Sequence, residues 1–232
     1  MEIFIMKWTS KYKKAVTFSY DDGVYQDIRL VEMFNKYGLK CTFNLNSGLM
    51  SPESVWYGDG VKVERIPPHM LAEVYAGHEI ASHSVTHGNF VQMNSHEIFN
   101  DINQDVAALE KLFGCEVRGF AYPYGATDER VEDVLRHCGI KYARGVVSSH
   151  NYDLPTDLLN ISPTCRHKEE NIFELAQKFI ESTLDEPQVF FLWGHSYEFD
   201  MQNSWERFEE FCRLISGHDD IYYGTCGDVF LT

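Results

Sequence analysis

The 232-residue chain predicts an α/β fold built on a parallel sheet, arranged either as a barrel or as a doubly wound sheet. Short apolar stretches of strand length alternate with stretches of helical apolar spacing along the whole sequence. Neither an internal repeat nor a linker of different composition divides the chain, so we expect one domain over residues 1–232. In both arrangements the chemistry belongs at the carboxyl ends of the strands.

The expected elements follow one another from near the N-terminus to the end of the chain. In order they are strand 14–22, helix 27–38, strand 39–46, a loop with Pro67 and Pro68, a helix and a strand within 70–84, helix 95–114, strand 117–125, helix 130–139, strand 140–147, helix 171–183, strand 187–195, helix 204–217, and a closing strand and tail 221–230.

Each assignment rests on local sequence signals. The strands are short runs rich in β-branched and aromatic residues, such as KAVTFSYDD and PQVFFLWGH. The helices repeat apolar residues every three or four positions. Gly38 and Gly77 end the first two helices, and Ser95 with Glu97 marks the start of the longest one.

Charge and hydropathy exclude several classes of partner. A formal net charge of -15 argues against nucleic-acid or anionic-membrane binding, because a negative surface repels phosphates. No stretch approaches the roughly 18 consecutive apolar residues of a membrane span. The apolar start of the chain is too short for a secretion signal, and its basic cluster follows it. We therefore expect a cytoplasmic protein, whose oligomeric state the sequence leaves open.

Several of the expected strands end in polar groups that are suited to chemistry. These groups are Asp21 with Asp22, His83, Tyr122 to Tyr124 around Pro123, Arg144 and His195. Because the carboxyl ends of parallel strands meet at one edge of the sheet, we expect these side chains to surround a single site.

His83 and His87 stand four positions apart, a spacing that lets two imidazoles reach one ion. Asp21 and Asp22 point in opposite directions at the end of a strand, so one can ligate while the other stays free. This predicts an open three-ligand site for one divalent ion, with zinc first and cobalt, nickel or manganese as alternatives. A free carboxylate can then take the proton of a metal-bound water. A plain acidic turn beside surface histidines is the alternative interpretation.

Four segments together resemble a known family. SYDDG at 19–23, GHEIASHSVTH at 77–87, FAYPYG at 120–125 and FFLWGH at 190–195 are similar, in order and spacing, to the motifs of NodB-type polysaccharide deacetylases, carbohydrate esterase family four. The resemblance extends from about residue 15 to the C-terminus. It implies a distorted (β/α) barrel with fewer than eight strands. It also implies a hydrolase of carbon–nitrogen bonds other than peptide bonds, which removes an N-acetyl group from a sugar with metal-activated water.

The resemblance also implies roles for individual residues. The metal ligands would be Asp22, His83 and His87. Asp21 would be the catalytic base, and His195 the general acid that protonates the leaving amine. Tyr124, which follows Pro123, would donate its backbone N–H to the tetrahedral oxyanion.

The sequence departs from the family pattern at two places. Ala121 stands where an arginine normally orients the base, so another arginine has to approach Asp21. Arg144 is the first candidate and Arg166 the second, and both are also candidates for binding the substrate or the oxyanion. The family's aspartate and tryptophan motif has no clear counterpart in NYDLPTDLLNISPTCRH.

These departures leave two alternatives to the sugar deacetylase. One is a hydrolase of a non-sugar linear amide or ester that uses the same site. The other is a catalytically impaired barrel that only binds carbohydrate.

Overall fold

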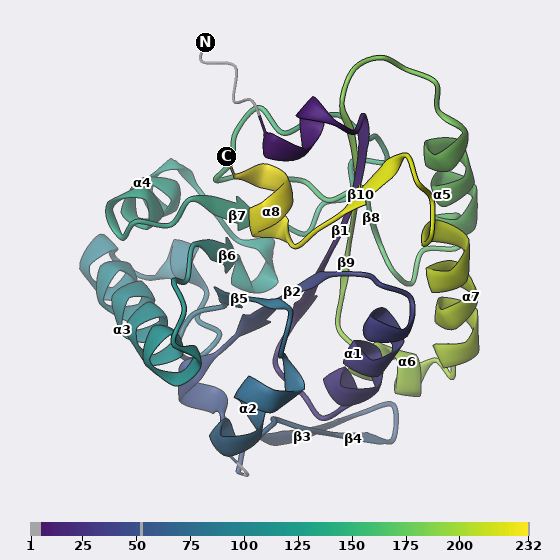
Figure 1. The fold of residues 1–232 in the computed structure, drawn as a ribbon. Helices are drawn as coiled ribbons and strands as arrows, with labels where there is room; N and C mark the ends of the chain where they lie inside the picture. The colour runs from purple at the N-terminus through teal and green to yellow at the C-terminus, as the bar shows by residue number, and fades with distance from the viewer. Residues whose placement is uncertain (1–5, 52, 232) are drawn as a thin grey trace.

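A computed structural model describes residues 6–51 and 53–231, and its centre is a curled sheet (Figure 1). Residues 1–5, at the start of the stretch used for the secretion prediction, lie outside the described residues, as do Pro52 and Thr232. The strands of the sheet are β1 (Lys14–Asp21), β2 (Cys41–Leu45), β5 (Glu79–Ser82), β6 (Gly119–Ala121), β7 (Tyr142–Arg144), β8 (Cys165–Arg166), β9 (Gln188–Gly194) and β10 (Ile221–Tyr223).

All pairs of neighbouring strands in this sheet are parallel, and seven strands form one curled path in the order β7-β6-β5-β2-β1-β9-β8. The eighth strand, β10, pairs with the first half of β1, while β2 pairs with its second half. An isolated parallel bridge between Arg144 and Ile161 links the β7 edge to the segment that leads into β8. The predicted distorted barrel with fewer than eight strands around its path is therefore confirmed.

Helices cover the outside of the curled sheet, with α3 and α4 on one side and α1, α5 and α7 on the other (Figure 1). Their bounds are α1 (Gln26–Lys36), α2 (Pro68–Val74), α3 (Ser95–Phe113), α4 (Glu129–His137), α5 (Ile172–Glu181), α6 (Tyr197–Met201), α7 (Trp205–Ile215) and α8 (Cys226–Phe230). Asn94 caps α3 in a capping box with Glu97, one residue before the predicted start.

Several segments differ from the sequence prediction, among them the short strand β8 and the short helix α6, which are not expected from the sequence. The predicted loop before α2 contains an antiparallel hairpin of β3 (Val55–Gly58) and β4 (Val61–Glu64). Asp59 and Gly60 form its turn in the left-handed region, and Asp-Gly between two short strands is a strong hairpin signal. The predicted tail after β10 is the helix α8, which Thr225 caps by accepting a hydrogen bond from the backbone N–H of Asp228.

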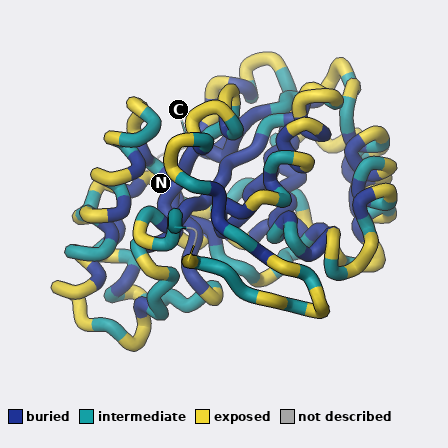
Figure 2. The backbone as a smooth tube through the Cα atoms, turned by 90° about the horizontal axis from the view of Figure 1, so that it is seen from below, coloured by how far each residue is buried: buried dark blue, intermediate teal, exposed yellow. Residues whose placement is uncertain are grey.

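The core surrounds β1, which is buried over its whole length because both faces of the sheet are covered. Aromatic side chains such as Phe18, Phe34 and Phe190 fill the space between the sheet and the helices α1, α5 and α7. Figure 2 shows the buried segments gathered in the middle of the molecule, with the exposed ones on outer helices and turns. The packed sheet therefore holds the carboxyl ends of its strands in fixed positions.

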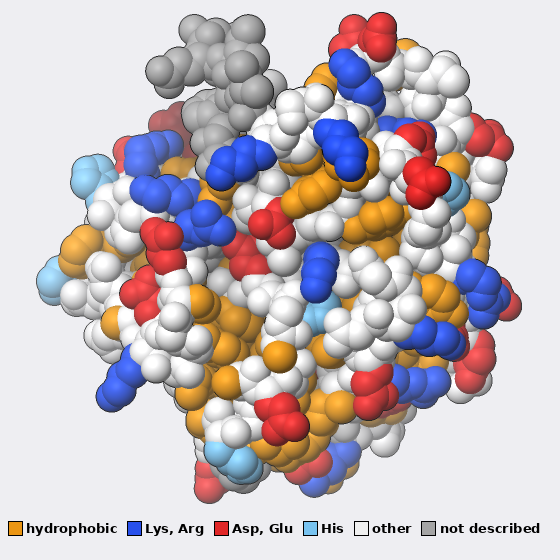
Figure 3. All heavy atoms as spheres, viewed as in Figure 1, with side chains coloured by type: hydrophobic (Ala, Val, Ile, Leu, Met, Phe, Trp, Pro, Cys, Tyr) orange, Lys and Arg blue, Asp and Glu red, His pale blue; other side chains and the backbone are white. Residues whose placement is uncertain are grey.

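The surface carries the acidic excess of the sequence. On the face shown in Figure 3, acidic and basic side chains of the described residues are intermixed. In the described part of the chain, none of the helices combines the length and the hydropathy that crossing a bilayer requires.

Candidate metal and catalytic site

The polar strand ends surround one cleft of about 600 Å³. Its lining includes Asp21, Asp22, His83, His87, Tyr122, Tyr124, Arg166, Lys168, Trp193, His195 and Tyr197. Two predicted site residues lie behind this lining, since Arg144 and Pro123 are buried. The structure thus brings most of the predicted site residues to one place, although they come from strands far apart in the sequence.

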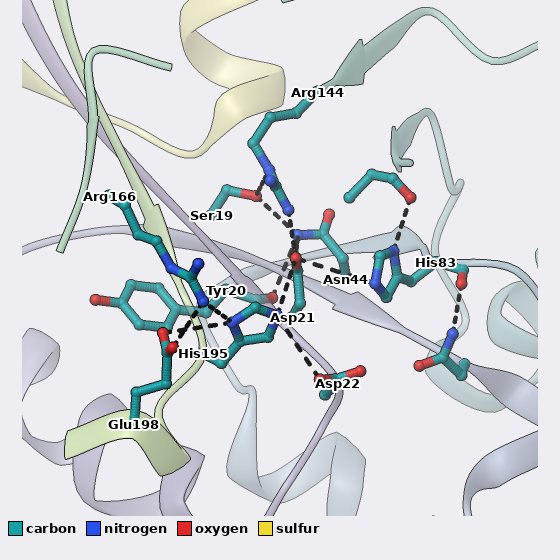
Figure 4. A network of polar contacts seen from close by, with 12 residues as sticks. Ser19, Tyr20, Asp21, Asp22, Asn44, His83, Arg144, Arg166, His195 and Glu198 are labelled. Atoms are coloured by element: carbon teal, nitrogen blue, oxygen red, sulfur yellow. Dashed lines mark hydrogen bonds and ion pairs between the residues drawn. The ribbon is translucent and has the colours of Figure 1, made fainter. Parts of the chain in front are cut away.

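Asp22, His83 and His87 form a group that could hold a metal ion, because each offers a ligand atom within 4.8 Å of the other two. The Nδ1 atom of His83 lies 2.7 Å from the carbonyl oxygen of Ala121 (Figure 4). This contact fixes the imidazole and leaves its Nε2 atom for ligation, since that atom is buried, has no hydrogen-bond partner among the described residues and lies 4.0 Å from Asp21 Oδ2. Two imidazole nitrogens and one carboxylate oxygen suit zinc and similar divalent ions.

The backbone and the protonation of these three residues fit the same use. Asp22 and His87 both have left-handed backbone conformations, with φ of 88° and 58°, which are uncommon for non-glycine residues and recur at functional sites. Burial lowers the pKa of His87 to about 4 and also lowers the pKa of His83. Both imidazoles are therefore neutral near pH 7, the form that binds metal.

Asp21 is a buried carboxylate held by a buried arginine (Figure 4). The Nη2 atom of Arg144 lies 2.5 Å and 2.6 Å from its two carboxylate oxygens, and Asn44 donates a third hydrogen bond at 2.7 Å. Burial alone would raise the pKa of Asp21, but Arg144, aided by His83 and His195, lowers it. Arg144 stands directly opposite Ala121 in the register of β6 and β7, so it supplies the guanidinium that residue 121 lacks.

His195 faces the same space from the end of β9. Its Nε2 atom lies 3.8 Å from Asp21 Oδ2 and 3.9 Å from Asp22 Oδ2. Its Nδ1 atom lies 3.1 Å from Arg166 Nη2 and 3.5 Å from Glu198 Oε2. Burial alone would lower the pKa of His195, but the neighbouring carboxylates of Glu198, Asp22 and Asp21 raise it.

Glu198 is a site residue that the sequence places near His195, either as a carboxylate that orients the imidazole or as a solvated loop charge, with the loop charge favoured. It lies in α6 three positions after His195, and it is buried among Arg166 at 2.6 Å, Lys168 at 3.2 Å and His167 at 3.4 Å. Burial alone would raise its pKa, but His195, His167 and Arg166 lower the pKa and keep the carboxylate ionised. The spacing of three residues at the start of a helix is the sequence signal that could have found it.

Arg166 and the neighbouring carboxylate Asp200 lie apart from Asp21. Arg166 donates to Glu198 and approaches His195, so it lies on the His195 side of the cleft, while Arg144 contacts Asp21. Asp200 is exposed and accepts hydrogen bonds from Gln26 and Trp205. Tyr124 has a φ of 61°, and its ring lies 4.6 Å from that of His87 at the mouth of the cleft.

Known proteins share this fold and parts of this sequence. The family model described as polysaccharide deacetylase matches residues 9–143. A bifunctional xylanase/deacetylase of Pseudobutyrivibrio xylanivorans is 30% identical over 118 residues, which cover 48% of this chain and 17% of that protein. A peptidoglycan deacetylase of Helicobacter pylori is 25% identical over 123 residues, which cover 53% of this chain and 37% of that protein. The match thus spans well under two thirds of either relative.

A solved structure gives the same picture of the fold. A family 4 carbohydrate esterase from Streptomyces lividans, in complex with acetate, superposes with a TM-score of 0.55 at 15% identity, covering 92% of this chain and 93% of that one. The family match covers more than half of the chain and contains the segments that carry Asp21, Asp22, His83 and His87. The chain therefore belongs to the polysaccharide deacetylase family.

Proposed function

We propose that this chain is a metal-dependent hydrolase that removes the N-acetyl group from an amino sugar of an oligosaccharide or glycan. One observation carries the proposal: an Asp-His-His ligand group shares a cleft with Asp21 and His195, whose facing atoms are 3.8 Å apart. The cleft is lined from the end of β1 to the start of α6. We therefore also propose that residues 1–232 act as one catalytic domain.

Asp22, His83 and His87 would hold one divalent ion, with zinc first and cobalt, nickel or manganese as alternatives. When bound, such an ion supplies a Lewis acid that polarises the acetamide carbonyl and acidifies water. Residues other than these three ligands, namely Asp21 and His195, would accept and donate the protons.

In the proposed reaction the oxygen of water bonds to the acetyl carbon while its proton passes to Asp21. Arg144 keeps Asp21 ionised and oriented, so the carboxylate is ready to accept that proton near neutral pH. The backbone N–H of Tyr124 is proposed to stabilise the oxyanion that develops on the carbonyl oxygen.

The carbon–nitrogen bond then breaks, and the amine nitrogen takes a proton from His195. The Nε2 atom of His195 is the one that faces the cleft, and ionised Glu198 favours the protonated imidazole. Acetate and a free amino sugar leave. Of the two protons of the attacking water, one on Asp21 and one on the acetic acid formed, one restores protonated His195 and the other passes to solvent.

A second candidate substrate is a non-sugar amide or ester on the same site, favoured by the missing aspartate and tryptophan motif in residues 151–167. The impaired, carbohydrate-binding barrel rested on the alanine at residue 121. Arg144 contacts the base from the neighbouring strand, which removes that support.

The test is metal content by mass spectrometry together with acetate release from chitin oligosaccharides, with and without a chelator. We expect about one metal ion per chain and acetate release that the chelator stops. Bound metal without acetate from any sugar would point to the non-sugar substrate. A chain that binds no metal would contradict the proposal.

Glu198→Gln is expected to lower the pH at which activity falls on the alkaline side of the pH profile. The acid must be protonated, so activity falls as pH rises through the pKa of His195. Glu198 raises that pKa, and removing its charge shifts the fall to lower pH. The measurement is kcat/KM for acetate release across pH.

The matched control for this variant is Asp200→Asn, in the same short helix. Asp200 contacts Gln26 and Trp205 rather than His195, so its alkaline limb should match that of the unmodified protein. An alkaline limb that stays in place in Glu198→Gln would show that Glu198 does not set the protonation of His195.

A further inference from the structure

A buried cation outside the proton-transfer groups lies against the proposed metal ligands. Arg65 directly follows β4 and is 7% exposed. Its Nη2 atom lies 3.1 Å from Oδ1 of Asp22, and its Nη1 atom donates to the carbonyl oxygen of Asp22. One guanidinium therefore contacts both the side chain and the backbone of this ligand.

The same guanidinium reaches the histidine segment through an asparagine. Nη1 of Arg65 donates to Oδ1 of Asn46 at 3.0 Å. The Nδ2 atom of Asn46 donates in turn to the carbonyl oxygens of His83 and Ser84. Arg65 thus connects the two strand ends that carry Asp22 and His83.

Backbone pairing places Arg65 at this position. The residue forms an antiparallel bridge with Val24, in the turn after β1. On either side, Tyr25 N–H donates to Glu64 O at 3.0 Å and Ile66 N–H donates to Gly23 O at 2.9 Å. The hairpin is therefore tied to the turn that presents Asp22.

Arg65 also joins the hairpin to the wall of the cleft. Its guanidinium carbon lies 5.1 Å from the ring centroid of Trp56, on β3. The ring of Trp56 packs edge-on against Tyr197, at 5.5 Å, and Tyr197 lines the cleft. This packing on an aromatic face holds the guanidinium in place.

We propose that Arg65 is a positioning residue for the metal ligands. It occupies Oδ1 of Asp22 and so leaves Oδ2, the oxygen 3.9 Å from His195 Nε2, as the one oxygen of this ligand on the cleft side. Through Asn46 it fixes the segment of His83 at the same time. This inference rests on the metal dependence proposed above.

The positive charge of Arg65 repels a cation, whereas its planar fork orients the ligands, so a test has to separate charge from geometry. Lysine at this position keeps the charge and loses the fork. Arg65→Lys is therefore expected to weaken zinc binding by about 10- to 100-fold, the usual effect of losing an outer-shell partner. The measurement is competition for zinc with a chromogenic chelator, which does not depend on turnover.

Arg207→Lys is the matched control. Arg207 also donates to two backbone carbonyls, those of Glu169 and Glu170, and lies 5.3 Å over the ring of Phe173. Arg207 shares with Arg65 the contacts to a backbone carbonyl and to an aromatic ring, but it contacts no proposed metal ligand, so the zinc affinity of Arg207→Lys should equal that of the unmodified chain.

Asn46→Ala tests the second half of the bridge if Arg65→Lys does not fold, and it should also weaken zinc binding. Unchanged zinc affinity in a folded Arg65→Lys, or in Asn46→Ala where the lysine variant is unfolded, would overturn the inference while leaving the proposed function intact. An unmodified chain that binds none of zinc, cobalt, nickel and manganese would overturn both.

Discussion

Asp21→Asn is expected to lower kcat for acetate release by about 10²- to 10⁴-fold, the usual contribution of a general base. Asparagine has nearly the shape of aspartate but cannot accept the proton of the attacking water. Zinc should stay bound, because the ligand group consists of Asp22, His83 and His87. The measurement pairs steady-state kinetics with metal content on the same sample.

The change also removes the partner of a buried cation. Losing one member of a buried ion pair typically costs about 3–5 kcal/mol, so the thermal unfolding of the variant has to be measured as well. Asp27→Asn is the matched control, since Asp27 is buried outside the cleft and accepts hydrogen bonds from Ser196 and Tyr75. Burial raises the pKa of Asp27 to about 7, so an uncharged amide resembles its protonated form. Near-normal turnover in a folded Asp21→Asn variant would rule Asp21 out as the base.

His83→Ala should lose both metal and activity. His83 is more buried than His87, and the contact between its Nδ1 atom and the carbonyl oxygen of Ala121 leaves Nε2 as the ligand atom. Removing a ligand should reduce zinc affinity by more than the roughly 10- to 100-fold that the loss of an outer-shell partner causes. Mass spectrometry of the purified protein, followed by zinc titration, measures the effect.

His96→Ala is the control for this variant, because His96 lies exposed at the start of α3 and contacts only Asn100 in its side-chain hydrogen bonding. It should keep its zinc and its turnover. A His83→Ala protein that retains stoichiometric zinc would show that zinc binds elsewhere on the chain.

The parts of the candidate site that could be predicted from sequence are those that depend on local patterns, such as the length of an apolar run or the spacing of two residues within one segment. β1 and β9 are buried apolar runs, and Asp21 and His195 follow from where these runs end. The spacing of His83 and His87 likewise lies within one short segment. Such features need only local geometry and the rule that parallel strands end at one edge.

The sequence ranks Arg144 before Arg166 as the partner of Asp21, but it cannot decide between them, because the answer depends on which strands are neighbours. β7 pairs with β6 and brings Arg144 to the base, while β8 pairs with β9 and brings Arg166 opposite Trp193. Strand order arises from the packing of the whole domain, and an isolated sequence contains no direct record of it.

For a related reason the sequence does not indicate Arg65, and it favours a solvated loop charge at Glu198. The hairpin that presents Arg65 has only four residues in each strand, and α6 has only five residues, so neither is long enough to show a clear period. Their importance comes from the groups they meet, which lie 43 residues away for Arg65 and Asp22 and 32 residues away for Glu198 and Arg166.

The pairing of Ala121 with Arg144 has a consequence for how members of this family are sorted. When the sequence alone is compared with the family pattern, Ala121 counts as the loss of the arginine that orients the base. In the structure, the guanidinium comes from Arg144, at the paired position on the neighbouring strand β7, and it contacts the carboxylate of Asp21. An arginine at either of two paired positions can therefore place a positive charge beside the carboxylate. A chain with alanine at the position of Ala121 should be classed as impaired only when the paired position on the next strand, that of Arg144, also lacks an arginine.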